Sequence, residues 1–236
     1  MGEPVVGPLV DPDDVPDWLR ALVKRTADMD AGRLGWPRTP PPPEAREAAV
    51  LILFGEGADG PDVLLLRRAE GLNSHPGQVA FPGGAVDDGD HGAVGAALRE
   101  AVEEVGVLPE GIRPVAVLPE LHVPHSGFRV TPVLAHWRSP SPVAPVDAAE
   151  TAAVARVPIS WLTDPENRVL VKLAGRHAGP AFLVPGMLVW GFTGGLLSGV
   201  LDLAGWSRGW DRSDVRELSD AWRAAEEADD VGFGTH

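Results

Sequence analysis

Residues 83–107 read GGAVDDGDHGAVGAALREAVEEVGV, in which a glycine pair and an acidic loop precede a helical pattern. Between Gly92 and Val105 apolar residues recur at intervals of three and four, the spacing of a helix with one buried face. The expected buried side chains are Val94, Ala97, Leu98, Ala101 and Val105. Gly106 is a typical helix stop, so the sequence predicts a helix over residues 92–105.

The opposite side of this helix is charged, within roughly 140° of arc at about 100° per residue. It carries Arg99, Glu100, Glu103 and Glu104. Glu100 and Glu104 are i, i+4 neighbours of like charge, an arrangement that costs roughly a few tenths of a kcal/mol. Carboxylate oxygens are the ligands that Mg²⁺ and Mn²⁺ prefer. These four residues alone also fit an ordinary solvated face.

The segment before the helix favours a binding site. Gly83 and Gly84 close a short strand, so backbone N–H groups there can approach a phosphate oxygen without obstruction. Asp87, Asp88 and Asp90 fill the connecting loop. A glycine-rich turn, an acidic loop and a carboxylate helix together indicate a metal–phosphate site better than chance surface charge does.

Short apolar runs bounded by glycine, proline and polar residues predict buried strands around this segment. They span residues 48–54, 63–66, 78–81, 115–118, 128–135 and 152–157. Strands, one helix, more strands and then helices indicate an α+β domain with a mixed sheet rather than a regular βαβ alternation.

The sequence divides by composition into three regions. Residues 1–45 hold a predicted helix, Pro16–Met29, and a stiff proline-rich linker, Pro37–Pro43. The helix is expected to pack against the main domain, with a homodimer contact as the alternative. Residues 46–205 form the main domain, and residues 206–236 an acidic helix around Ser213–Glu227 followed by a tail.

Composition excludes several function classes. The chain has 236 residues, no cysteine and a formal net charge of −14. Disulfides, thiolate catalysis and cysteine zinc sites are therefore absent, and a nucleic acid partner is disfavoured. Residues 182–206 are the one membrane-like stretch, but Pro185, several glycines and Asp202 favour a buried strand followed by a core helix. We expect a cytoplasmic protein with no membrane contact.

Residues 99–107, REAVEEVGV, together with Gly84 resemble the Nudix box, whose second half is R-E-U-x-E-E-x-G-U with U apolar. The first half departs from that pattern. The acidic position is Asp90 instead of glutamate, and eight residues instead of seven separate it from Arg99. The resemblance implies a Nudix-type α/β/α sandwich and a pyrophosphohydrolase activity.

Residues 64–84 and 126–133 are similar to the signature of the coenzyme A pyrophosphatase branch of that superfamily. Asn73 stands where the branch usually has arginine. The resemblance implies hydrolysis of coenzyme A or a derivative to 3′,5′-ADP and 4′-phosphopantetheine. Another nucleotide substrate, such as a nucleotide sugar, dinucleotide or nucleoside triphosphate, is the second hypothesis, and a non-catalytic nucleotide-sensing domain is the third.

The resemblance also implies roles for the charged residues. Glu103 and Glu104 would bind Mg²⁺ or Mn²⁺, and Glu100 would be a further ligand or the base that activates water. Arg99 would orient the carboxylates by ion pairing. Glu150 resembles a late glutamate that acts as base or extra ligand in some members.

The candidate contacts to a nucleotide-diphosphate substrate lie between the second strand and the glycine pair. They are Arg67, Arg68, His75, Gln78, Gly83 and Gly84. The alternative for the charged and polar residues is an ordinary surface position, and for the glycines a turn without ligand contact.

Overall fold

The computed structural model describes residues 6–36, 41–42, 44–123, 127–172 and 178–228. Within these residues the largest element is a nine-stranded mixed sheet with strand order β1-β6-β8-β2-β3-β4, in which β5 joins β2, β7 joins β8 and β9 joins β3. The strands are β1 (Gly7–Pro8), β2 (Arg46–Gly57), β3 (Gly60–Arg68), β4 (Val79–Ala80), β5 (Gly83–Ala85), β6 (Ile112–Val117), β7 (Leu121–Val123), β8 (Phe128–Trp137) and β9 (Thr151–Pro158). Strands β2 and β8 run parallel, whereas the other pairs are antiparallel.

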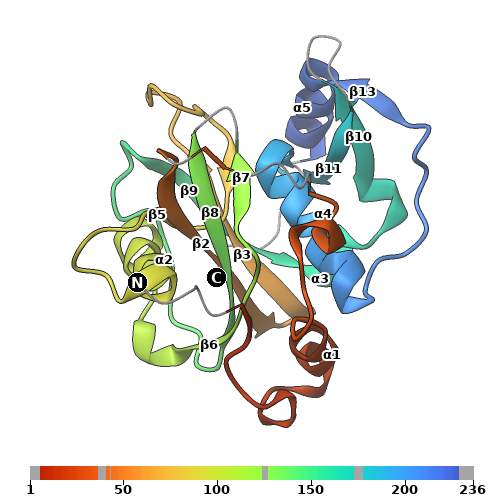
Figure 1. Cartoon of the computed structure of the whole chain (residues 1–236). Helices are drawn as coiled ribbons and strands as arrows, with labels where there is room; N and C mark the ends of the chain where they lie inside the picture. The colour runs from red at the N-terminus through yellow and green to blue at the C-terminus, as the bar shows by residue number, and fades with distance from the viewer. Residues whose placement is uncertain (1–5, 37–40, 43, 124–126, 173–177, 229–236) are drawn as a thin grey trace.

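The helices are α1 (Asp17–Arg25), α2 (Gly92–Val105), α3 (Ile159–Leu162), α4 (Gly191–Ala204) and α5 (Leu218–Glu227). Figure 1 shows α2 on one side of the main sheet and α1 and α4 on the other. The expected α+β class and α/β/α sandwich with a mixed sheet are therefore confirmed. Every strand predicted from the sequence is present, although the run 78–81 is reduced to β4.

The middle of strand β2, residues 48–54, is apolar and lies between two covered faces of the sheet. Leu51 and Leu53 face α2, whereas Ile52 and Phe54 face the opposite side, and all four are fully buried. A strand covered on both faces has no solvent side for polar residues.

Helix α2 has the predicted bounds, and its left-handed Gly106 (φ 70°) ends it. The observed buried face of α2 is slightly rotated about the helix axis relative to the predicted one. Ala96 is fully buried with Ala97 and Ala101, while Val94 and Leu98 are only partly buried. Small alanine side chains allow the helix to lie close to the sheet.

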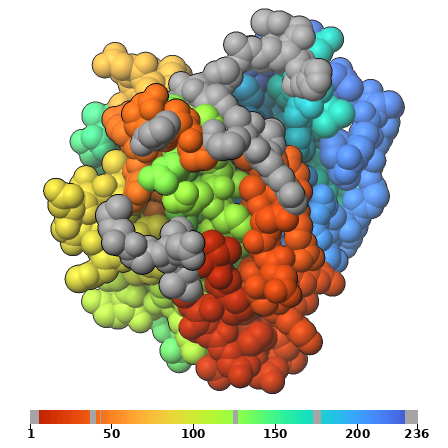
Figure 2. Space-filling model, viewed as in Figure 1, coloured from red at the N-terminus to blue at the C-terminus, as the bar shows by residue number. Residues whose placement is uncertain are grey.

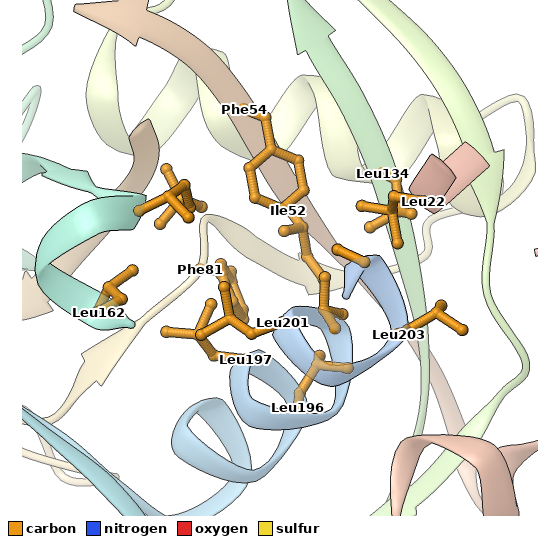
Figure 3. Close-up of a cluster of buried hydrophobic side chains, with 14 of the residues drawn as sticks. Leu22, Ile52, Phe54, Phe81, Leu134, Leu162, Leu196, Leu197, Leu201 and Leu203 are labelled. Carbon is orange, nitrogen blue, oxygen red and sulfur yellow. The ribbon is translucent and has the colours of Figure 1, made fainter. Parts of the chain in front are cut away.

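The second face of the sheet is covered by helices from both ends of the chain. Leu22 of α1 and Leu196, Leu197 and Leu201 of α4 meet Ile52 in one core cluster, part of which Figure 3 shows. Figure 2 shows the N-terminal residues (red to orange) along the seam between the main sheet and the C-terminal part (blue).

The connection η2 (Ala31–Leu34) packs closely on α4. A Cβ atom at Gly199 would stand 2.6 Å from the carbonyl oxygen of Leu34, so only glycine allows this approach. Of the predicted proline linker, only residues 41–42 belong to the described part, and they are neither helix nor strand.

A second sheet, absent from the sequence prediction, has the order β12-β11-β10-β13. Its strands are β10 (Arg168–Lys172), β11 (Gly179–Val184), β12 (Met187–Val189) and β13 (Val215–Glu217). The expected helix from Ser213 was wrong in its first turn, because β13 pairs in parallel with β10 and α5 begins only at Leu218. The stretch 182–206 forms strands and the buried helix α4, as predicted. No helix of the described residues is both long and apolar enough to cross a bilayer.

Candidate active site

Helix α2 presents its charged side to the short strand β5. The backbone N–H of Gly83 donates a hydrogen bond to Oε2 of Glu104 at 2.9 Å. Glu100 lies one turn earlier, with its side chain 18% exposed, whereas Glu103 points outward and is 57% exposed. The three predicted metal-binding glutamates therefore differ in burial, and Glu104 and Glu100 are the two that face the glycine pair.

Both glycines of the pair are required by close packing. A Cβ atom at Gly83 would overlap the carbonyl oxygen of Ala49 and the backbone of Val50 in β2. A Cβ atom at Gly84 would overlap the carboxyl group of Glu100. Strand β5 can thus lie between β2 and the carboxylates of α2. Contact of either glycine with substrate stays a prediction.

Arg99 binds several acidic groups at once. Its Nε and Nη2 donate to the two carboxyl oxygens of Asp90 at 3.0 and 3.1 Å. Its Nη1 donates to Glu100 and to Glu103, each at 2.9 Å. The expected ion pairing of Arg99 with carboxylates of α2 is present, and it includes both Glu100 and Glu103.

The sequence interpretation gave Asp90 no role, and the structure places it at the centre of this network. Its side chain is only 6% exposed, and Oδ2 also accepts the backbone N–H of Asp87 at 2.9 Å. The Arg99 guanidinium holds the pKa of Asp90 below its usual range. The acidic position of the box was the available signal, but the extra loop residue obscured it.

The electrostatics of Glu104 are unusual. Burial raises the pKa of Glu104 to about 7, and the charges of Glu100 and Glu150 act in the same direction. The hydrogen bond from Gly83 and the charge of Arg68 oppose the shift. Burial also raises the pKa of Glu100, against the pull of Arg99.

These groups fit a hard divalent cation by their chemistry. The donors are carboxylate oxygens, they lie close enough to repel one another, and Glu104 has no ion pair in the described residues. In the same described part of the chain, no three acidic or histidine side chains form a ready-made metal cluster. Glu100 and Glu103 both bind Arg99 instead. Metal binding therefore stays a proposal.

Arg67 and Arg68 end strand β3 but lie on different faces of the sheet. Arg67 pairs with Val79 and Ala153, whose side chains pack in the cluster under α1 and α4. Arg68 follows on the α2 face, where its charge lowers the pKa of Glu104. The sequence analysis predicted both arginines as phosphate contacts. In the structure only Arg68 lies near the glutamates of α2.

His75 and Gln78 lie in the loop that follows β3. His75 has a left-handed backbone (φ 54°), and its Nδ1 is 3.1 Å from Oε1 of Gln78. The carbonyl of Gln78 accepts the N–H of Arg68 at 3.0 Å. Glu150 is exposed, and its carbonyl accepts the N–H of Ala69 at 2.9 Å. The loop is therefore joined by its backbone to the strand end that carries Arg68.

A family model described as the NUDIX domain matches residues 44–174, more than half of the chain. The chain belongs to this family, which confirms the resemblance noted in residues 83–107.

Its curated relatives include the protein named "Uncharacterized Nudix hydrolase NudL" of Enterobacter sp. (strain 638), 44% identical over 121 residues, which are 49% of this chain and 58% of that protein. The protein of the same name from Escherichia coli (strain K12) is 49% identical over 89 residues, 38% of this chain and 45% of that protein. The matched segments thus cover less than two thirds of these relatives.

Solved structures with a similar arrangement include the Nudix hydrolase RenU of M. smegmatis, with a TM-score of 0.43 and 27% identity over 51% of this chain and 74% of that one. A C. elegans Ap4A hydrolase gives a TM-score of 0.41 and 23% identity over 48% of this chain and 80% of that one.

Proposed function

We propose that this protein is a metal-dependent pyrophosphohydrolase that cleaves the diphosphate bond of a nucleoside-diphosphate-linked substrate. The observation that carries the proposal is the buried carboxyl of Glu104, hydrogen-bonded to Gly83 and placed beside Glu100 at the end of the sheet. Burying acidic groups together is unfavourable unless a cation offsets their charge. Membership of the NUDIX domain family supports the same chemistry.

The proposed ligands of Mg²⁺ or Mn²⁺ are Glu100, Glu103 and Glu104. A bound divalent cation would polarise a phosphate oxygen and lower the pKa of a water molecule. The N–H of Gly83 holds the carboxyl of Glu104 in one orientation. Arg99 keeps Glu100 and Glu103 on the same side of α2.

The remaining predicted residues would act on the substrate. Arg68 lies where its guanidinium can bind a phosphate oxygen beside Glu104. Glu150 is a candidate for the base that accepts a proton from water, because its charge acts on the same carboxyl. His75 and Gln78 are further candidate substrate contacts, and their side chains lie 3.1 Å apart in the loop after β3.

Coenzyme A or a derivative is the first candidate substrate, on the similarity of residues 64–84 to that branch of the family. Another nucleotide is the second candidate, because Asn73 stands where that branch usually has arginine, a residue suited to phosphate. The cytoplasmic location and the homodimer contact stay predictions.

Mass spectrometry of the reaction products tests the proposal. The protein is incubated with coenzyme A, ADP-ribose, NADH or a nucleoside triphosphate, each with Mg²⁺, Mn²⁺ or EDTA. We expect 3′,5′-ADP and 4′-phosphopantetheine from coenzyme A, only when metal is present. Cleavage of a different compound would keep the chemistry and change the substrate. If no compound is cleaved with either metal, a non-catalytic nucleotide-sensing domain becomes the better explanation.

Glu103→Gln tests the proposed metal ligands in the same assay. We expect it to lose most activity and to keep its fold, because the side chain is 57% exposed. Full turnover by this variant would contradict the proposed ligand set.

A further inference from the structure

The two arginines that end β3 are separated by the sheet itself. Arg67 and Arg68 are consecutive, so their side chains leave the strand on opposite faces. A β-bulge interrupts the pairing with β9 between them, where Arg67 faces Ala153 and Arg68 faces Thr151. The extra residue at this point is Ala152 of β9, so β3 keeps its alternation through Arg67 and Arg68.

Neither guanidinium group has an ion pair or hydrogen bond within the residues that the structure describes, and the Nε atom of each is buried. Three other arginines of the same sheet, Arg113, Arg129 and Arg156, form ion pairs. Arg129 binds Glu47 and Arg156 binds Asp62, each at 2.6 Å. The chain has 34 acidic residues against 20 lysines and arginines, so acids are plentiful. Arg67 and Arg68 are therefore available to an anion from solution.

We propose that Arg68 and Arg67 contact two different anionic groups of one substrate. Arg68 takes the diphosphate on the α2 face, and Arg67 takes a second phosphate on the face under α1 and α4. The inference rests on the proposed function and deepens it. It makes Arg67 a specificity-determining residue for substrates that carry a phosphate monoester besides the diphosphate.

The separation of the two side chains is the reason for assigning two phosphates. The phosphorus atoms of a diphosphate share one bridging oxygen and cannot reach across a sheet to both guanidinium groups. A phosphate on the ribose of a nucleoside diphosphate is separated from the diphosphate by several bonds, and it points away from it. A guanidinium fork suits the oxygens of such a group. Coenzyme A has a phosphate of this kind, and dephospho-coenzyme A lacks it.

The test compares hydrolysis of coenzyme A and dephospho-coenzyme A by the full chain. Arg67→Met removes the charge and keeps the stem that packs near Val79, while Arg67→Lys keeps the charge. For Arg67→Met we expect the ratio of kcat/KM between the two substrates to fall about tenfold or more, chiefly through KM for coenzyme A. For Arg67→Lys we expect a kcat/KM ratio between that of Arg67→Met and that of the wild type. Arg68→Met is the matched control and should lower kcat/KM for both substrates together.

Binding of 3′,5′-ADP and 5′-ADP, measured by calorimetry in EDTA, gives a second readout that needs no turnover. Arg67→Met should weaken binding of 3′,5′-ADP about tenfold and change binding of 5′-ADP much less. An unchanged substrate ratio would overturn the inference. An equal loss for both substrates would also overturn it, because Arg67 would then act at the diphosphate or on the fold.

The two proposals can fail separately. If the wild type cleaves neither compound, the proposed substrate is wrong, and the calorimetry still decides the role of Arg67. Selective loss of 3′,5′-ADP binding in Arg67→Met would then support a second phosphate site. Equal binding by wild type and variant would reject it.

Discussion

At the residue scale, Glu104 is both held in place and difficult to ionise. The Gly83 N–H favours its carboxylate form, yet burial and the neighbouring charges of Glu100 and Glu150 raise its pKa to about 7. Its unfolded-state reference value is 4.5. The folded chain without metal therefore binds this proton more tightly than the unfolded chain, and ionising Glu104 costs stability.

This shift predicts that the metal-free protein loses stability as pH rises. The favourable contribution is complete below pH 4.5 and is lost as pH rises through about 7. Each pKa unit corresponds to about 1.4 kcal/mol, so the difference between 4.5 and about 7 corresponds to a loss of roughly 3.5 kcal/mol. In EDTA, Glu104→Gln should have a smaller drop in Tm between pH 5 and pH 8 than the wild type. The exposed Glu103→Gln is the control, and an identical drop in wild type and Glu104→Gln would contradict the assignment.

Asp90 supports the second prediction at this scale, because it holds Arg99 by two charge-assisted hydrogen bonds. Asp90→Asn should release the guanidinium that fixes Glu100 and Glu103. We expect kcat to fall about tenfold to a hundredfold with little change in KM, since both carboxyl oxygens of Asp90 are bound by protein groups and Asp90 acts by positioning Arg99. Asp88→Asn, in the same loop and exposed, should keep kcat. Equal kcat in wild type and Asp90→Asn would remove Asp90 from the positioning network.

Only part of this site could be predicted from the sequence. Glu100, Glu103 and Glu104 follow from helical spacing, and the structure places them on one side of α2. The separation of Arg67 from Arg68 depends on which side of the sheet α2 covers, and that is a tertiary fact. The role of Asp90 depends on a loop whose length departs from the family pattern.

At the element scale, local signals were sufficient for α2 and insufficient for the second sheet. Helix α2 has regular apolar spacing and a glycine stop, so both of its ends were predicted. Strand β13 has three residues that are exposed or partly exposed, and it forms by pairing with β10 more than forty positions earlier. No local sequence signal predicts such a long-range pairing, so the sequence prediction placed these residues in a helix.

The prediction at the element scale concerns β5, because replacing its two glycines by alanine should have different effects. Gly83→Ala would press on the backbone of β2, so it should destabilise the fold by about 1 to 3 kcal/mol. Gly84→Ala would press on the carboxyl group of Glu100, which can turn away. It should therefore lose most activity at nearly normal Tm. Denaturation and kcat measured for both variants check this, and a large stability loss in Gly84→Ala with normal kcat would contradict it.

At the scale of the whole molecule, one core cluster extends across the boundary predicted at residue 45. The cluster under the main sheet joins α1 from the N-terminal region, β2 from the family-matched region and α4 beyond it. Leu22 and Leu197 are fully buried there. Trp18 of α1 also packs against Phe54 of β2, with ring centroids 6.5 Å apart. A shared core couples the folding of the segments that build it.

This coupling predicts one cooperative unfolding transition for the N-terminal helix and the main sheet. Leu22→Ala should lower the free energy of unfolding by about 2 to 5 kcal/mol, because it leaves a cavity between α1 and α4. The matched control is Val102→Ala on the outer side of α2, where the side chain is 37% exposed and the change should cost about 0.5 kcal/mol or less. Urea denaturation is followed by tryptophan fluorescence and by circular dichroism. Coincident curves that shift together in Leu22→Ala are expected. A separate early transition in that variant, with the main one unmoved, would instead show that residues 1–45 form an independent unit.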